Sequence, residues 1–227
     1  MSDALRSASF RKRDFRLRIT ILCLLLLGMA ATAFAGEDRP MVANLGKDPV
    51  PRKKNIVAPP LVTEKYDYYE VGGSCEKDLQ CEMNQKGIKW NDGKKYDSTT
   101  SWKVKWDYGY DRAPRTCSAD AFRVTVAITF RLPKWTRAGD ASQQLVDKWD
   151  SYMKNLLAHE NGHRDMAVEA AADLSRAVAE LPPALSCDEL DRQVQKMCRA
   201  RMRELKEDEV EYDTATNHGY TQGAVFP

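Results

Sequence analysis

The chain has 227 residues, of which 43% are hydrophobic and 30% charged, with a formal net charge of +2. This composition fits one globular domain with a processed leader. Removing the six basic and two acidic residues before position 36 from the totals of 35 and 33 leaves 29 and 31, a net charge of −2. No basic stripe that could neutralise phosphates remains, so nucleic acid is excluded as the expected partner.

The first segment has the pattern of a signal peptide. Basic residues come first, an apolar run follows from Ile19 to about Ala31, and Ala33-Phe34-Ala35 gives the small-x-small pattern that a signal peptidase accepts. We expect residues 1–35 to be removed by cleavage before Gly36, and the mature protein to be periplasmic or secreted. The alternative is that the segment stays uncleaved and anchors the protein, although the run is short for a span of about 20 residues. We expect no other contact with the membrane.

Cysteine usage agrees with export. An oxidising compartment permits two disulfides and one free thiol among the five cysteines that follow position 36: Cys75, Cys81, Cys117, Cys187 and Cys198. Residues 186–189 read as a capping box, which places Cys187 in the first turn of a helix. If that helix reaches Cys198, the two lie about 16 Å apart along its axis, too far for a disulfide.

Residues 36–60 are predicted to form a Pro-rich arm, and residues 61–227 the functional domain. Three strand candidates open the domain: residues 61–71, 101–110 and 122–130. The last two alternate apolar and polar residues, which is typical of half-buried strands in an antiparallel or mixed sheet. Pro133 is expected to end the third strand, and residues 72–100 to form a loop with a short helix.

The hydrophobic period then changes to that of helices. Residues 142–181 contain no Pro and a single Gly, and Pro182-Pro183 stops the predicted helix. A second helix is expected from about Ser186 to Tyr212, followed by a loop. The predicted fold class is α+β: a small antiparallel or mixed sheet packed on a long helix and a second C-terminal helix, a minimal zincin-like arrangement.

The first of these helices carries the motif HExxH, as His159-Glu160-Asn161-Gly162-His163. Residues i and i+4 share one helix face, so both imidazoles can bind one metal ion. Glu160 lies beside them and is predicted to take a proton from a zinc-bound water, whose pKa zinc lowers to about 7. The chain has only three histidines, which makes the spacing improbable by chance. We therefore expect Zn²⁺ on His159 and His163, with Glu160 as general base.

A catalytic zinc needs a third protein ligand and an open position. His218, in the loop after the second helix, is the favoured ligand. Glu204 with Asp208, and Glu209 with Asp213, fit an ExxxD spacing on that helix, and Asp213 by itself is a further option.

Several other side chains are candidates around such a site. Tyr212 and Tyr220 could donate to an oxyanion, and we retain Tyr220 as the predicted donor. Asp165 and Asp173 could orient a ligand imidazole, or be solvated helix charges. Trp102 and Trp106 are most simply core residues, although an edge strand near a metal could bind an extended peptide by strand addition.

From about Tyr66 onwards the sequence resembles the bacterial family of predicted secreted zinc-dependent proteases, a domain family of unknown function. The resemblance rests on a turn at Leu132-Pro133-Lys134-Trp135, on the segment from Trp149 through His163, and on a tail containing Tyr212-Asp213, Thr216 to Gly219 and Gln222-Gly223-Ala224. It implies that His159, Glu160, His163 and His218 form the site.

The expected function is that of an exported zinc metallopeptidase with a peptide or protein substrate. Two alternatives remain open. One is a zinc-stabilised binding module of the cell envelope without catalytic activity, whose metal shell is closed. The other is a hydrolase of a different amide, such as one in the cell wall, because the walls of the pocket set specificity.

Overall fold

A computed structural model of the protein describes residues 57–90, 93–137 and 139–226. The predicted signal peptide and most of the Pro-rich arm lie outside these residues. The elements in chain order are β1 (Leu61–Gly73), α1 (Glu76–Lys86), β2 (Ile88–Lys89), β3 (Lys95–Tyr96), β4 (Thr99–Ala113), β5 (Thr116–Arg137), α2 (Gln143–Ala179), α3 (Cys187–Thr216) and a 3₁₀ turn (Tyr220–Gln222).

The main sheet is mixed. Its strand order is β1-β5-β4, with β1 parallel and β4 antiparallel to β5, while β2 and β3 form a separate small antiparallel pair. Along β5 the even-numbered residues from Val124 to Leu132 are buried, whereas Arg123, Ala127 and Arg131 are exposed. One face of the sheet is therefore apolar and is covered by helices, which confirms the α+β class and the mixed sheet.

The prediction that the third strand ends at Pro133 was wrong. β5 continues to Arg137, so the segment Leu132-Pro133-Lys134-Trp135, expected to be a turn, is strand. Pairing between β4 and β5 extends only to Arg131 on β5, whereas pairing with β1 continues to the end. A proline is accommodated there because β5 has a single neighbour beyond Arg131.

The two long helices begin where their caps predict. The side chain of Ser142 accepts a hydrogen bond from the Leu145 amide at the start of α2, and Ser186 accepts one from the Glu189 amide at the start of α3. α3 is one turn longer than expected, because it ends only at Asn217, whose φ of 48° places it in the left-handed region. This extra turn brings the end of α3 level with the middle of α2.

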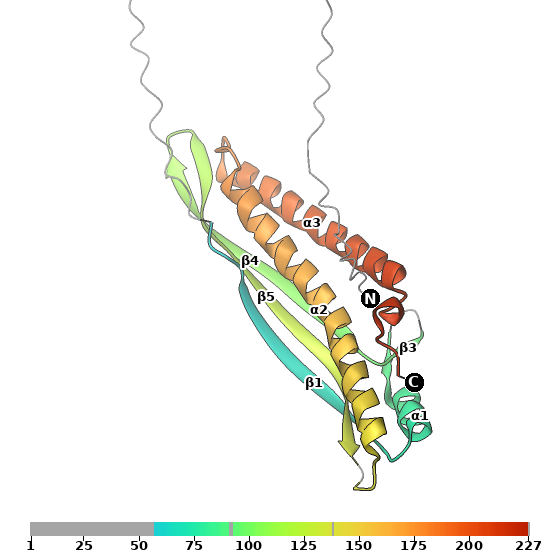
Figure 1. The fold of residues 1–227 in the computed structure, drawn as a ribbon. Helices are drawn as coiled ribbons and strands as arrows, with labels where there is room; N and C mark the ends of the chain where they lie inside the picture. Colours follow the sequence, from blue (N-terminus) through green and yellow to red (C-terminus); the bar gives the residue numbers. More distant parts are fainter. Residues whose placement is uncertain (1–56, 91–92, 138, 227) are drawn as a thin grey trace, which may run out of the picture. The chain divides into compact units, whose positions relative to one another are not determined.

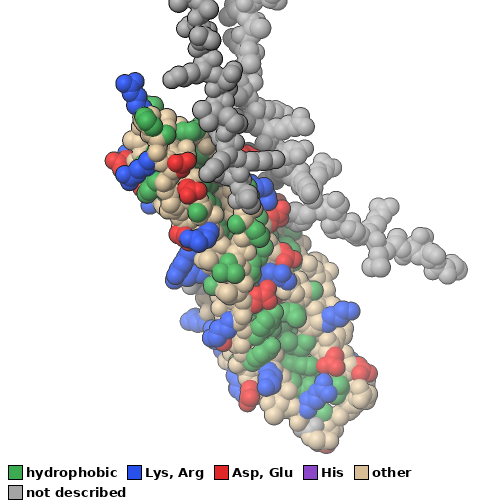
Figure 2. Space-filling view, turned by 90° about the vertical axis from the view of Figure 1, so that its left-hand side faces the viewer, with side chains coloured by type: hydrophobic (Ala, Val, Ile, Leu, Met, Phe, Trp, Pro, Cys, Tyr) green, Lys and Arg blue, Asp and Glu red, His purple; other side chains and the backbone are tan. Residues whose placement is uncertain are grey.

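The helices form one layer on the sheet. α2 crosses the apolar face of the sheet and α3 lies beside α2, as Figure 1 shows. The core between the layers is built from β5 and α2, with Phe130, Tyr152 and Leu174 among its fully buried side chains. On the side of the molecule seen in Figure 2, acidic and basic side chains are interspersed with hydrophobic ones, without a continuous field of one sign.

A disulfide joins the start of β5 to the start of α3. Cys117 and Cys187 are bonded, with their Cα atoms 5.1 Å apart, which confirms that Cys187 does not pair with Cys198. Cys75 and Cys81 are exposed free thiols, and Cys198 is a buried one. Among the described residues the chain therefore forms one bridge where two were permitted.

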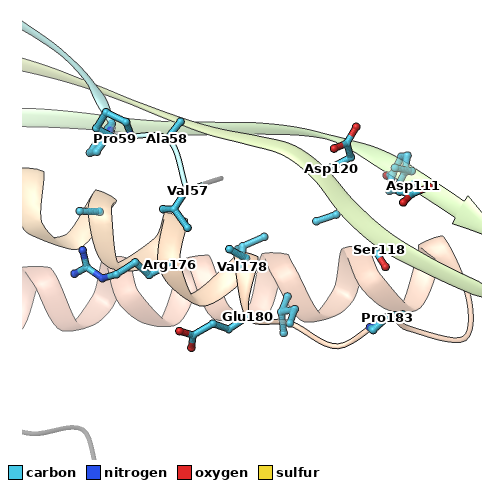
Figure 3. Close-up of a pocket in the computed structure, with 16 residues that line it drawn as sticks. Val57, Ala58, Pro59, Asp111, Ser118, Asp120, Arg176, Val178, Glu180 and Pro183 are labelled. Carbon is cyan, nitrogen blue, oxygen red and sulfur yellow. The ribbon is translucent and has the colours of Figure 1, made fainter. Parts of the chain in front are cut away.

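None of the described helices is long and apolar enough to cross a membrane. A groove is lined by residues 57–60, by the paired ends of β4 and β5, and by the last turns of α2 (Figure 3). Ala172 is the lining residue of α2 that comes closest in sequence to His163, and nine residues of helix place them about 14 Å apart. The groove is thus separate from the HExxH segment.

Candidate metal centre

The middle of α2 and the end of α3 place two histidines and one aspartate together. His159 and His163 lie one helical turn apart and are 4% and 8% exposed. Their Nε2 atoms lie 3.3 Å and 3.1 Å from the same oxygen, Oδ1 of Asp213. One ligand atom from each of the three residues lies within 4.8 Å of the others, a grouping that can hold one metal ion.

The opposite ring nitrogens contact oxygen atoms. Nδ1 of His159 lies 3.0 Å from Oε1 of Gln222, and Nδ1 of His163 lies 3.8 Å from Oε1 of Glu209. An imidazole that donates from Nδ1 keeps its lone pair on Nε2. Both Nε2 atoms face the Asp213 carboxylate, and two imidazoles with one carboxylate make a donor set that fits zinc.

The charges of the group support each other. Burial opposes ionisation of Asp213, but its hydrogen bonds and charge interactions with His159 and His163 outweigh burial and hold its pKa well below the usual range. Burial likewise opposes protonation of His163, yet the hydrogen bond that its ring donates to Asp213, together with the charges of Asp213, Glu160 and Glu209, raises its pKa. In the metal-free protein, positive charge on His163 compensates the carboxylate.

His218, the favoured third ligand, lies at the edge of this group. Its Nδ1 is 3.7 Å from Oδ2 of Asp213, and its side chain is 46% exposed. Its ring packs against that of Tyr96, with centroids 4.9 Å apart. The structure therefore brings Asp213, one of the alternatives left open by the sequence, together with His159 and His163, and places His218 on the outer oxygen of that aspartate.

Glu160 is buried between α2 and the start of β4. The Ser98 hydroxyl donates to its Oε1 at 2.5 Å, and the Thr100 hydroxyl donates to its Oε2 at 2.6 Å. Glu160 is only 3% exposed, so these two hydrogen bonds replace those that water would make to its carboxylate. A carboxylate has about four acceptor positions, which leaves lone pairs free on both oxygens.

Tyr212 packs on both histidines. Its ring is stacked on His159, with centroids 5.1 Å apart and 10° between planes, and meets His163 edge-on at 5.1 Å. A Cβ atom at Gly162 would lie 2.3 Å from the Tyr212 hydroxyl oxygen. The glycine inside HExxH is thus required by the close approach of this ring.

The remaining sequence candidates lie further out. Tyr220 is 62% exposed, so its role as an oxyanion donor stays a prediction. Glu204 is exposed, and Asp208 pairs with Arg201.

The other polar candidates have partners or solvent. Asp173 bonds Arg176 and Arg201, and Asp165 is largely solvated. The Trp102 indole donates to Glu209 Oε1 at 2.6 Å, and Trp106 is half-buried beneath the helices.

Sequence reasoning missed three residues of the centre. Ser98 lies just before β4 and Thr100 lies within it, and the alternation of apolar and polar residues along this strand predicts only that one face is buried. Gln222 lies in the tail that follows α3. Nothing in their spacing marks them, because each contacts the centre across 60 or more residues of chain.

The fold and the centre together define a small α+β protein with a candidate His-His-Asp metal centre held between two helices. The family model described as "Bacterial protein of unknown function (DUF922)" matches residues 66–219, more than half of the chain, and the protein belongs to this family. No curated protein and no solved structure matches it. The zincin-like character of the fold stays a prediction.

Proposed function

We propose that this protein is an exported zinc-dependent hydrolase that cleaves peptide bonds. The observation that carries the proposal is the convergence of His159 Nε2 and His163 Nε2 on one oxygen of Asp213, with Glu160 next to His159 in the same helical turn. His159, His163 and Asp213 hold the metal, and a fourth position is left for water. Zinc bound there supplies a water of pKa about 7 and polarises the substrate carbonyl.

Glu160 is the general base in this proposal. The hydroxyls of Ser98 and Thr100 hold its carboxylate in place, and it accepts the proton of the attacking water. The free lone pairs of its two oxygens receive that proton. Glu160 then returns the proton to the leaving amine.

A second candidate function follows from His218. Its Nδ1 lies 3.7 Å from Oδ2 of Asp213, and a movement of this exposed ring towards the two α2 histidines would add a fourth protein ligand. A metal with four protein ligands is closed to substrate and stabilises the fold alone. The protein would then be a zinc-stabilised binding module of the cell envelope.

The variant Glu160→Gln tests the proposal. The zinc-loaded protein from Gly36 onwards is incubated with unfolded casein, and new N-termini are counted by mass spectrometry. We expect native zinc content and a loss of hydrolysis of about 10²–10⁴-fold, the usual contribution of a general base. Glu169→Gln, on an exposed position of the same helix, is the matched control and retains activity.

Two results contradict the proposal. A Glu160→Gln protein as active as the native one excludes Glu160 as the base. Native protein that holds one zinc, unfolds on chelation and cleaves nothing, while His218→Ala lowers its zinc affinity, favours the binding module.

A further inference from the structure

We infer that Gln222 is a positioning residue of the metal centre, whose side-chain oxygen holds Nδ1 of His159 so that Nε2 is presented to the metal. The inference rests on the proposed metal centre. It assigns a role to a residue three positions beyond the stretch that the family model matches.

Hydrogen bonds fix which end of the Gln222 amide faces His159. The Tyr212 hydroxyl lies 3.2 Å from the backbone oxygen of His159 and 3.4 Å from Oε1 of Gln222, and it donates to the nearer of the two, so its own oxygen is free to accept. The Nε2 group of Gln222 donates to that oxygen, also at 3.2 Å. The amide oxygen of Gln222 is thereby turned towards His159.

The amide oxygen in turn selects the tautomer of His159. It lies 3.0 Å from Nδ1, and an amide oxygen can only accept, so Nδ1 carries the hydrogen. The neutral ring then has its lone pair on Nε2, the nitrogen that faces Asp213. A metal ligand whose other nitrogen is hydrogen-bonded binds more tightly, because the correct tautomer and ring orientation are already in place.

The tail is shaped to bring Gln222 to this position. Gly219 and Gly223 flank its 3₁₀ turn with φ values of 81° and 79°, where other residues are strained. A Cβ atom at Gly219 would lie 3.0 Å from Cγ of His159, so the backbone passes directly over the ring. The side chain of Asn155 donates to the Gly223 oxygen at 3.1 Å and holds the far end of the turn.

The test compares the loss of the hydrogen bond with a loosening of the tail. Gln222→Leu removes the acceptor, Gln222→Glu keeps an acceptor for Nδ1, and Asn155→Ala frees the tail without touching His159. Gln222 is exposed and Asn155 is half-buried outside the hydrophobic core, so the three variants leave the core unchanged. Zinc affinity is measured by competition with a chromophoric chelator, on the protein from Gly36 onwards.

We expect Gln222→Leu to bind zinc about 10- to 100-fold more weakly, the usual effect of losing such a partner. Gln222→Glu and Asn155→Ala should stay within about threefold of the native protein, a change smaller than that range. Long-range ¹H–¹⁵N spectra of the zinc-loaded native protein should show Nδ1 of His159 protonated and protected from exchange, and that protection should be lost in Gln222→Leu. With three histidines in the chain, the signals can be assigned by single substitutions.

Two results would overturn the inference while leaving the metal centre intact. One is native zinc affinity in Gln222→Leu. The other is an equal loss in Asn155→Ala, which would assign the effect to packing of the tail. A native protein that binds no zinc would instead overturn the metal centre, and this inference with it.

Discussion

Substituting Gly162 tests the packing around the two histidines. In Gly162→Ala the new Cβ would lie 2.3 Å from the hydroxyl oxygen and 2.5 Å from Cζ of Tyr212. The ring cannot simply swing away, because it is stacked on His159 and its hydroxyl bonds the His159 backbone oxygen. Such overpacking costs about 1–3 kcal/mol, and contacts this short belong in the upper half of that range.

A second effect acts in the opposite direction. Alanine in a helix interior is more favourable than glycine by about 1 kcal/mol. The clash wins in the native background, so we expect a net destabilisation of about 1–2 kcal/mol. In a Tyr212→Ala background the obstacle is gone, and the same substitution should stabilise the protein by about 1 kcal/mol.

The four proteins of this cycle are compared by urea unfolding in the presence of a chelator, so that metal binding does not contribute. Ser151→Ala, on an exposed position of α2 away from Tyr212, is the control for a change to alanine in this helix and should be mildly stabilising. A change of sign between the two backgrounds means that Gly162 and Tyr212 are coupled. If Gly162→Ala stabilises both backgrounds equally, the ring of Tyr212 does not lie over Gly162, and our description of the centre is wrong.

Three further predictions concern the rest of the fold. Burial raises the pKa of Asp97, and the hydrogen bond from Tyr152 opposes this only in part. The folded protein therefore favours the protonated carboxyl. The stability that Asp97 contributes is fully present below its unfolded pKa of about 3.9 and is lost as the pH rises through its folded pKa. Urea unfolding should therefore show Asp97→Asn gaining stability over the native protein between about pH 3.5 and about pH 7; a constant difference would contradict this. The Cys117–Cys187 disulfide joins residues 70 positions apart, so replacing both cysteines by Ala should lower the free energy of unfolding by about 4 kcal/mol. An unchanged midpoint of urea unfolding would mean that the disulfide does not form. Burial raises the pKa of Cys198 to about 12, so an aromatic disulfide reagent should label the two exposed cysteines of the folded protein from Gly36 onwards and not Cys198; labelling of Cys198 at the same rate would contradict its burial.

Much of the fold could be predicted from local signals. The period of two along β5 and the period of 3.6 along α2 each report the burial of one face, and the capping serines Ser142 and Ser186 mark where the helices begin. The end of β5 was missed because a proline is a local signal, whereas its tolerance depends on where the neighbouring strand stops. That stopping point is a property of the sheet and has no counterpart in the sequence around Pro133.

The candidate site could be predicted only in part. His159 and His163 share a helix, so their spacing alone predicts that they face the same point. The third member depends on where α3 ends: a helix ending at Tyr212 leaves Asp213 in a loop, whereas the observed extra turn directs its carboxylate at both imidazoles. Gln222 could not be predicted, because the path of the tail over His159 depends on tertiary contacts.

The most direct test of the central claim is the zinc content of single alanine variants, measured by elemental mass spectrometry on the protein from Gly36 onwards. We expect about one zinc per native chain, as in other sites with three protein ligands. Asp213→Ala, like the two α2 histidine variants, should lose most of it, while His218→Ala and the exposed control Glu211→Ala retain it. Loss of zinc in His218→Ala together with its retention in Asp213→Ala would contradict the His-His-Asp centre, and a native protein without zinc would contradict any metal centre at these residues.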